Sequence, residues 1–468
     1  MGTNYNRSII KQVEELTLTN ERLVCENESL RNENKALREE MAAFKTLMES
    51  TIEKLTAEIE RLRAQINKNS GNSSKPPSQD GFKRIQNSRE PSERRRGGQP
   101  GHPGHRLELP KGMDELIGKG MARRDLCDHT GGAKTYTTRY TIDIDIMLVV
   151  TEHRYFDGST PKGAEITYGD QIKSLATLLS VDGIIAEERL SDFFSELTHG
   201  AIQLSDATIE KFLTEVSDKL DGEIEAIETD LLNEPVLHVD ETPERCVEKP
   251  DYTGEEPTIL KAQGTSYNTY VRTHSNATST LYTVNPQKDI EGVERDNLLP
   301  RYVGIISQDH EAKFYHYGTA HATCGAHLSR ELRGLFELQK VPWADEMRQF
   351  MANMNHHKNA DLAAGKTRCD KDKLFEFEHG FDQLLIKGRH ALSQLKANEL
   401  GHDELRRMLN RLTEYKDSYL LFIRDYRAPF TNNQAERDLR PCKTKQKISG
   451  CFRTWGGVQR FTSRSSQK

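Results

Sequence analysis

The segment EPVLHVDETPERC, residues 234–246, is a short apolar run that ends in acidic residues. A second run of this kind, RYVGIISQDHEAKFYHY, occupies residues 301–317. Between them lie two strand-like stretches and a helix-like one, TYVRTHS (269–275), STLYTVN (279–285) and DIEGVERDNLL (289–299). Residues 320–425 have an almost entirely helical pattern. Three strands, a helix, a strand and then helices predict a mixed α/β unit.

Two acidic residues stand directly after the apolar runs, Asp240 after residues 236–239 and Asp309 after residues 304–308. If the two strands are neighbours in one sheet, these carboxylates lie side by side at its edge. Carboxylates so close repel each other unless cations lie between them, and hard divalent cations prefer oxygen ligands. The pair therefore predicts a metal site.

Glu436 is the candidate for a third acid, because NNQAER at 432–437 reads as the start of a helix. A third acid would complete a site for two ions about 3.5–4 Å apart. Several basic residues follow it: Arg437, Arg440, Lys443, Lys445 and Lys447. A metal site beside a phosphate-binding surface suits phosphodiester chemistry. The alternatives are acids at ordinary strand and helix ends, and a solvated basic face.

Residues 9–66 contain neither glycine nor proline and are predicted to form one long helix. Leucine recurs at every seventh position, which is typical of a leucine zipper, and Phe44 continues the row: Leu16, Leu23, Leu30 and Leu37. In this register three consecutive a positions are asparagine, Asn20, Asn27 and Asn34. Such residues favour a parallel two-stranded coil in fixed register. After Met48 the seam shifts by a stutter. A solitary, charged helix is the alternative.

Residues 67–106 are rich in Ser, Asn, Pro and Gly and carry the run Arg94-Arg95-Arg96, which predicts a flexible basic linker. Between Lys75 and Arg106 the sequence contains eight Lys or Arg and three Asp or Glu, although the whole chain has a net charge of −6. Between Glu436 and Lys468 it contains nine Lys or Arg and two Asp or Glu. Basic patches on an otherwise acidic chain indicate nucleic acid binding. For the linker, a solubilising role is the alternative.

The region between the linker and the first acid divides in two. TYTTRYTIDIDIMLVVTEHRYF, residues 135–156, is β-branched and alternating, which predicts one or two strands. Three amphipathic stretches between residues 171 and 232 predict helices, with Ser205 as an N-cap. Short helices joined by tight turns suit either a helix-turn-helix unit or an ordinary packing domain.

The composition bounds the class of protein. At roughly 150 residues per domain, 468 residues predict about three domains. Only 35% of the residues are hydrophobic, no apolar run approaches a bilayer span, and the N-terminus lacks a secretory signal. We therefore expect a cytoplasmic protein without a membrane segment. The seven cysteines are scattered without a CxxC pair, so we expect reduced, structural thiols and no zinc site.

The chain resembles the transposases of the insertion sequence 66 (IS66) family, which are DDE transposases with an RNase H-like catalytic core. Four stretches carry the resemblance: NSSKPPSQDG with GGQPGHPGH (72–81 and 97–105), LHVDETP (237–243), CGAHLSREL (324–332), and NNQAERDLRP with SGCFRTWGG (432–441 and 449–457). The last two are the most specific, because they are long and occur in the right order. The resemblance covers the chain from about residue 67 onward.

The resemblance implies that Asp240, Asp309 and Glu436 are the catalytic triad and bind two Mg²⁺ ions, for which Mn²⁺ could substitute. Asp240 would end the first core strand, Asp309 would end the fourth, and Glu436 would follow a long helical insertion. His327 and Arg330 would contact DNA or support the site, unless they form a structural surface pair. The predicted DNA contacts are Arg94, Arg95, Arg96, His327, Arg330, Arg437, Arg440 and Lys443.

The implied activity is metal-dependent strand cleavage and transfer at the terminal inverted repeats of an insertion sequence, with transfer into target DNA. The partners would be DNA, a second copy bound through the coiled coil, and accessory proteins if the element needs them. On DNA the protein would be nucleoid-associated. In two places the chain departs from the family: only Cys127 remains of the zinc-binding segment, and the end RFTSRSSQK is atypical. A catalytically decayed or domesticated copy, acting as a DNA-binding coiled-coil protein, is the alternative.

The predicted fold is therefore a multidomain α/β protein. Its expected parts are a parallel coiled coil (9–66), a basic flexible linker (67–106), a small degenerate β module in place of the zinc-binding segment (107–165), a helical, DNA-binding or packing domain (166–232), an RNase H-like core (233–318 and 426–460) and a helical insertion (319–425).

Overall fold

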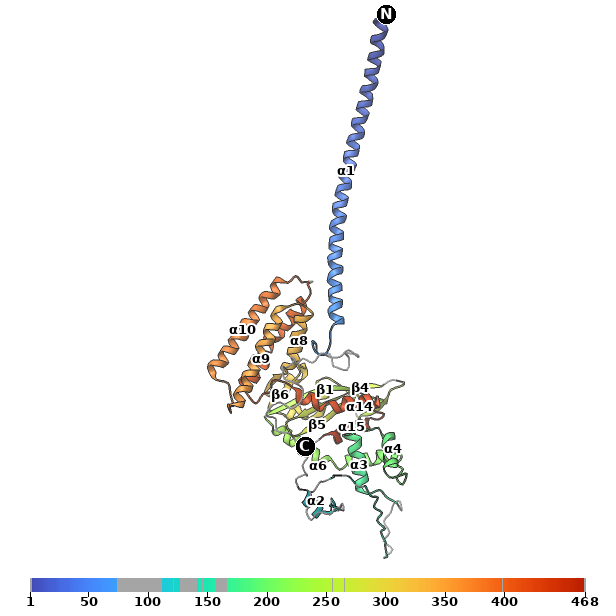
Figure 1. The fold of residues 1–468 in the computed structure, drawn as a ribbon, viewed down its shortest axis with the longest axis vertical. Coiled ribbons are helices and arrows are strands. Elements are labelled where there is room, and N and C mark those ends of the chain that lie inside the picture. The colour runs from blue at the N-terminus through green and yellow to red at the C-terminus, as the bar shows by residue number, and fades with distance from the viewer. Residues whose placement is uncertain are drawn as a thin grey trace, which may run out of the picture.

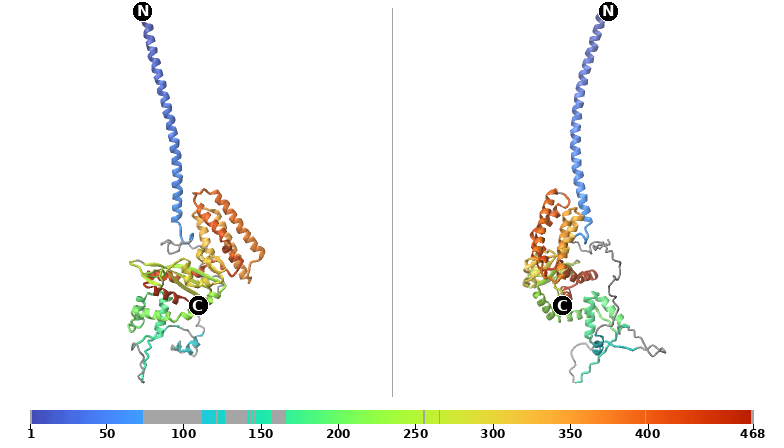
Figure 2. Two further views of the ribbon diagram at one scale, coloured as in Figure 1. Left: turned by 180° about the vertical axis from the view of Figure 1, so that it is seen from behind. Right: turned by 60° about the vertical axis from the view of Figure 1, so that its left-hand side comes forward.

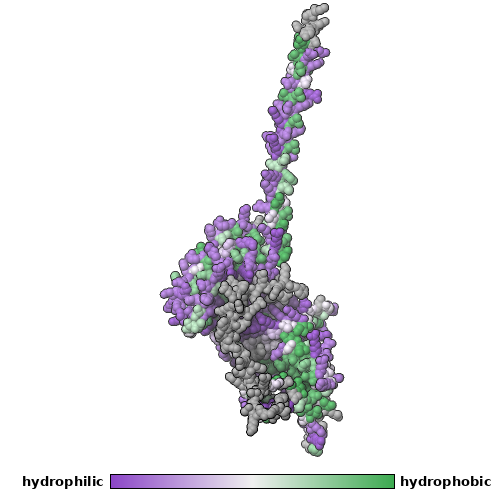
Figure 3. Space-filling model, viewed as in Figure 1, coloured by the Kyte–Doolittle hydropathy of each residue, from purple (hydrophilic) through white to green (hydrophobic). Residues whose placement is uncertain are grey.

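A single helix, α1 (Gly2–Ile66), forms the N-terminal part of the chain and extends away from the rest of the molecule (Figure 1). This computed structural model describes residues 2–73, 112–120, 122–126, 141–156 except 143 and 145, and 166–466 except 255, 265 and 398. At 65 residues, α1 is about 100 Å long. Its heptad residues are exposed and form an apolar row along the helix (Figure 3). The long helix is confirmed, and its pairing into a coiled coil stays a prediction.

The turn after α1 packs closely against the helical part of the body. Asn72 in this turn is only 6% exposed. Its carbonyl oxygen lies so near Gly334 of helix α8 (Gly325–Glu337) that a Cβ at Gly334 would stand 2.1 Å from it. Glycine at this position therefore permits the contact between the turn and α8.

The expectation of strands in residues 135–156 is wrong for the part of this stretch that the structure describes. Residues 141–156, where described, form neither strand nor helix, and Ile144 and Val150 are 85% and 94% exposed. A strand needs a neighbouring strand to satisfy its backbone hydrogen bonds, and the sheets formed by the described residues do not include this stretch. A short helix, α2 (Met113–Gly118), lies before them. Cys127 and Arg94–Arg96 lie outside the described residues.

Four helices form between residues 170 and 233, where the amphipathic pattern predicts helices: α3 (Asp170–Val181), α4 (Glu187–Leu197), α5 (Asp206–Ser217) and α6 (Asp221–Asn233). Ser205 caps α5 as predicted, since its hydroxyl accepts a hydrogen bond from the backbone N–H of Thr208 at 3.2 Å. Helices α3, α4 and α5 share a core that includes Leu190, Phe194 and Leu213. Helix α6 packs against the sheet instead, through Ile227 and Leu231.

A five-stranded mixed sheet forms the centre of the body, in the order β5-β4-β1-β6-β7. Its strands are β1 (Val236–Cys246), β4 (Tyr267–Ser275), β5 (Thr280–Asn285), β6 (Ile305–Gln308) and β7 (Ala320–Thr323). Strands β5, β4 and β1 pair antiparallel, whereas β1, β6 and β7 pair parallel. Two strands of a separate hairpin, β2 (Glu248–Asp251) and β3 (Thr258–Lys261), escaped prediction, as did β7.

Helices cover both faces of this sheet. On one face, Leu237 and Val239 of β1 pack against α6 and against α7 (Ile290–Asp296). On the other face, Val271 and Tyr282 pack against the C-terminal helices. These are α13 (Asn433–Asp438), α14 (Arg440–Ser449) and α15 (Trp455–Ser465). Two short 3₁₀ helices flank β6, η2 (Leu299–Arg301) and η3 (Ala312–His316).

The predicted helical insertion consists of α8, α9 (Pro342–Ala363), α10 (Lys371–Gln394), α11 (His402–Glu414) and α12 (Lys416–Arg424). It begins at Gly325 rather than at residue 319, because β7 still belongs to the sheet. Figures 1 and 2 show these orange helices on one side of the sheet and the green helices α3 and α4 on the other. The chain is thus a multidomain α/β protein with a long N-terminal helix. Among the described helices, none has the length and apolar character needed to cross a membrane.

Candidate active site

Strands β1 and β6 bring Asp240 and Asp309 to the same edge of the sheet. The parallel pairing places His238 opposite Ser307, and each acid lies two residues beyond its member of that pair. Side chains two residues apart on a strand point to the same face, so Asp240 shares the face of His238. One detail of the prediction is wrong: Asp240 does not end its strand. Strand β1 continues to Cys246, because β4 still pairs with it beyond the point where β6 stops.

Helix α13 brings Glu436 over this face, and Asn432 fixes the start of that helix. The side chain of Asn432 is fully buried, and its Nδ2 donates to the carbonyl oxygen of Val239 at 2.9 Å. Its Oδ1 lies 3.0 Å from Nδ1 of His238. Asn432 is the N-cap residue by position, but its side chain binds β1 and makes no capping hydrogen bond. Glu436 is thereby tied to the strand that carries Asp240.

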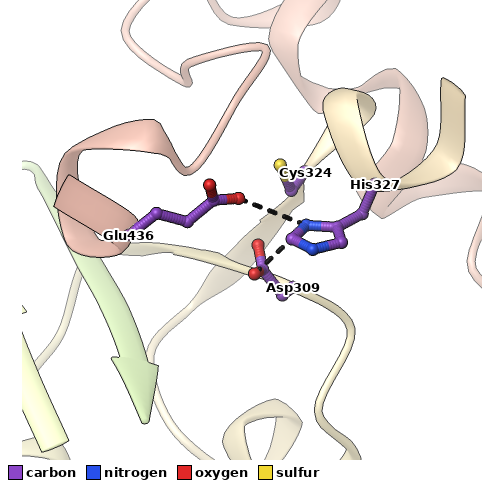
Figure 4. Close-up of side chains that lie close together, drawn as sticks. All are labelled: Asp309, Cys324, His327 and Glu436. Carbon is purple, nitrogen blue, oxygen red and sulfur yellow. Dashed lines mark ion pairs between the residues drawn. The ribbon is translucent and has the colours of Figure 1, made fainter. Parts of the chain in front are cut away.

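Helix α8 contributes His327, whose ring points toward two of the acids (Figure 4). Its Nδ1 is 3.1 Å from Oδ2 of Asp309 and 3.5 Å from Oε1 of Glu436. Cys324, the residue before α8, belongs to the same cluster, in which one ligand atom from each of the four residues lies within 4.8 Å of the others. Arg330, one turn along α8, reaches Glu436 at 3.7 Å. His327 and Arg330 therefore face the acids.

The acids of the site lie close enough to affect one another. Burial and the neighbouring Asp309 raise the pKa of Asp240 to about 7. Oδ1 of Asp309 and Oε1 of Glu436 are buried without a hydrogen bond. Burial lowers the pKa of His327, but the Asp309 carboxylate and the Cys324 thiol outweigh it and raise this pKa to about 10. A buried carboxylate oxygen without a hydrogen-bond donor, such as Oδ1 of Asp309, fits a hard divalent cation.

A buried ion network lies behind Asp240, on the opposite face of the sheet. Glu241 accepts from Arg272 at 2.6 Å and from Lys313 at 2.9 Å. Arg272 is completely buried and also pairs with Asp296. The backbone N–H of Glu241 in turn donates to Oδ1 of Asp240 at 2.7 Å. This network anchors β1 immediately beside the candidate catalytic acid.

The basic residues that follow Glu436 differ in how far the fold exposes them. Arg437, Arg440 and Lys443 are exposed on α13 and α14, and Lys443 is close enough to Asp240 to lower its pKa. Lys445 is half-buried, and burial lowers its pKa while Glu187 of α4 opposes this effect. The side of α14 that carries Lys445 thus packs toward the α3–α5 unit. Of the exposed basic residues on α13 and α14, Lys443 is the one whose charge acts on an acid of the site.

Sequence reasoning missed Asn432 and Cys324 as parts of the site. Asn432 is the first residue of NNQAERDLRP, and Cys324 is the first residue of CGAHLSREL, three residues before His327. Only the fold reveals their contact, in which the backbone N–H of Asn432 donates to Sγ of Cys324 at 3.3 Å. No local pattern predicts a hydrogen bond between residues so distant in the sequence.

Comparison with known proteins gives two family matches. The transposase IS66 family matches residues 175–460, a range that includes all three acids and His327. A family of unknown function (DUF6444) matches residues 6–108, which cover most of α1 and the segment after it. Neither curated proteins nor solved structures gave a match.

Proposed function

This chain belongs to the IS66 transposase family, and we propose that it catalyses DDE-type strand cleavage and transfer at the terminal inverted repeats of an insertion sequence. The observation that carries the proposal is the convergence of Asp240, Asp309 and Glu436. These acids come from a central strand, the end of its parallel neighbour and a helix after the insertion. Such convergence of three acids is the arrangement expected for metal-dependent phosphodiester chemistry.

We also infer an RNase H-like catalytic core. In chain order, leaving aside the β2–β3 hairpin, β1 is the first strand of the sheet and β6 is the fourth. Asp240 lies on β1, and Asp309 directly follows β6. This agrees with the strand positions that the family resemblance predicts for the first two acids. Glu436 then follows a set of helices, as predicted for the third.

Asp240, Asp309 and Glu436 would hold the divalent cations, for which Mg²⁺ and Mn²⁺ are both suited by their preference for oxygen. When bound, such ions activate the attacking oxygen and stabilise the leaving one. The mutual effect of the Asp240 and Asp309 carboxyl groups, and the buried Oδ1 of Asp309 that makes no hydrogen bond, support this assignment. Cys324 and His327 add softer donors at the same place.

The other side chains of the site would position the acids and the DNA. Asn432 holds the start of α13, and His327 and Arg330 balance the charge of Glu436. The exposed Arg437, Arg440 and Lys443 are suited to neutralise DNA phosphates next to the acids. Such contacts would position the scissile phosphate without reading the base sequence.

A strand-cleavage and strand-joining assay tests the proposal. The substrate is a duplex that carries the element's own terminal repeat, with a target plasmid, in Mg²⁺ or in EDTA. Native protein should cleave and join only with the metal. Asp240→Asn should reduce cleavage at least about 10²-fold, because it removes a metal ligand. Asp218→Asn, at an exposed acid of the helical unit, should be unaffected.

Two results would contradict the proposal. Specific binding of the repeat by the native protein, without cleavage in any divalent metal, would indicate a DNA-binding protein that has lost catalysis. Cleavage without joined product would indicate a nuclease.

Lys443→Ala tests a phosphate contact at this residue. If Lys443 binds the DNA backbone, the slope of log K for DNA binding against log salt concentration should be smaller in magnitude by about one in the variant.

A further inference from the structure

A second cluster of metal-ligating side chains lies within the helical insertion, where α9 ends and the chain turns toward α10. His357 and Asp361 are four residues apart on α9 and therefore share one face of this helix. Cys369 lies two residues before α10 begins. One nitrogen, one oxygen and one sulfur ligand atom from these three residues all lie within 4.8 Å of one another.

The donor atoms of this cluster face one another. Nε2 of His357 is buried without a hydrogen bond and lies 3.4 Å from Oδ2 of Asp361. Tyr426 donates its hydroxyl to the same Oδ2 at 2.7 Å, and Lys366 binds the other oxygen, Oδ1, at 3.1 Å. Such outer contacts orient a carboxylate that binds a metal. Cys369 is a buried free thiol, only 6% exposed.

We propose that His357, Asp361 and Cys369 form a zinc site in the insertion. A set of nitrogen, oxygen and sulfur donors suits a borderline-soft ion, whereas Mg²⁺ and Ca²⁺ bind oxygen ligands. In tetrahedral zinc sites each ligand lies about 2.0–2.3 Å from the ion, which fits donor atoms spaced as in this cluster. Three protein ligands would leave the fourth position of a tetrahedral zinc site to water.

The place of this site in the fold suggests what the ion does. Tyr426, which binds Asp361, lies in the segment that leads from the insertion back to the catalytic core. Close by on α9, the buried Lys358 donates to the carbonyl oxygen of Ala428 at 2.5 Å. This return segment continues to Asn432 and Glu436. Zinc would therefore fix the end of α9 to the segment that carries the third acid.

Cobalt(II) titration of the full-length chain tests the proposal without DNA, so its outcome is independent of the proposed transposase activity. The protein is stripped of metal and titrated with Co²⁺ as a spectroscopic substitute for Zn²⁺. We expect one equivalent with tetrahedral bands and a thiolate-to-cobalt charge-transfer band, displaced by Zn²⁺. Cys369→Ser should abolish the charge-transfer band. Cys324→Ser, which removes the thiol of the active-site cluster, should leave it unchanged.

Zn²⁺ affinity gives a second readout. Tyr426→Phe should weaken Zn²⁺ binding about 10–100-fold, because it removes a hydrogen bond to a ligating carboxylate. Zn²⁺ should raise the Tm of the native chain and not that of Cys369→Ser or His357→Gln. Cooperative unfolding of the stripped variants near the native Tm shows that they are folded.

Two outcomes would overturn the proposal. A charge-transfer band that survives in Cys369→Ser and disappears in Cys324→Ser would assign the thiolate ligand to the active-site cluster. A native chain that gives no such band, and no zinc-dependent rise in Tm, would show that the three side chains hold no metal.

Discussion

Asn432 joins the helix of the third acid to the strand of the first acid through its buried side chain. Its amide contacts both the carbonyl of Val239 and the ring of His238. Buried polar groups that lose their partner typically cost about 1–3 kcal/mol. This residue thus contributes to the stability of the core and to the position of Glu436 at the same time.

Substitution of Asn432 should therefore impair catalysis more than substitution of the neighbouring Asn433 does. We expect Asn432→Ala to lower the cleavage rate by about 10²-fold, because small misplacements of a catalytic group have effects of that size. Asn433→Ala is the matched control, since Asn433 is exposed and lies next to it on α13. Both variants should be assayed below their unfolding temperature. Equal rates for the two variants would contradict the positioning role.

Glu244 is a buried acid for which the described residues supply no hydrogen bond at one oxygen. It is 1% exposed, and its Oε1 has no partner. Burial raises the pKa of Glu244 to about 8, against a smaller opposing effect of Lys443. Between about pH 4.3 and this value, the folded chain retains a proton that the unfolded chain has lost. The free energy of unfolding must then fall as the pH rises through this window.

Glu244→Gln should remove this fall in the free energy of unfolding, because the glutamine side chain does not ionise. We expect the variant to be more stable than the native chain at pH 8, on the order of 2 kcal/mol, and to differ less at pH 5. Urea unfolding at both pH values measures the difference, with the exposed Glu223→Gln as control. A difference that does not change with pH would mean that Glu244 is ionised in the folded chain.

Strand β1 carries two kinds of chemistry on its two faces. Leu237 and Val239 point into the apolar core on the face covered by α6 and α7. Glu241 points to the same face and takes part in the buried ion network. His238 and Asp240 point to the opposite face, toward α13 and the acids. Alternation along one strand therefore fixes the first acid over a rigid, fully packed support.

Helix α1 has an apolar row that needs a partner. Its leucines are about half to two-thirds exposed, for example Leu23 at 51% and Leu16 at 68%. We predict that residues 1–70 sediment as a dimer at tens of micromolar. Leu30→Lys should shift the species to monomer, because it places a charge at a d position, whereas Ser29→Lys should not. A monomeric native segment in analytical ultracentrifugation would refute the zipper.

At the scale of the molecule, the sequence predicted the main α/β order, the long helix and the helices of the insertion. These features are recorded locally, in strand alternation, helical periodicity and the absence of glycine and proline from residues 9–66. Strand β7 was missed because AHAT is only four residues long and lies next to a helix. In the described part of 135–156 the expected strands do not form, because alternation alone does not supply a pairing partner.

For the site, the sequence proposed the three acids but not the contacts that support them. Asp240 and Asp309 could be paired from their positions after apolar runs, and Glu436 was proposed from its helix start before the family resemblance implied the same role. The ion network of Glu241, Arg272 and Lys313 depends on which residues the sheet and helices bury together. Long-range contacts of this kind carry no local signal.

The proposed strand cleavage requires that Asp240, Asp309 and Glu436 share a divalent metal. Iron-directed hydroxyl-radical cleavage tests it most directly: Fe²⁺ with ascorbate cuts the backbone close to where the ion binds. We predict cuts near residues 240, 309 and 436, suppressed by excess Mg²⁺ and by Asp309→Asn. Cuts absent from these three positions, or confined to residues 357–369, would contradict the claim.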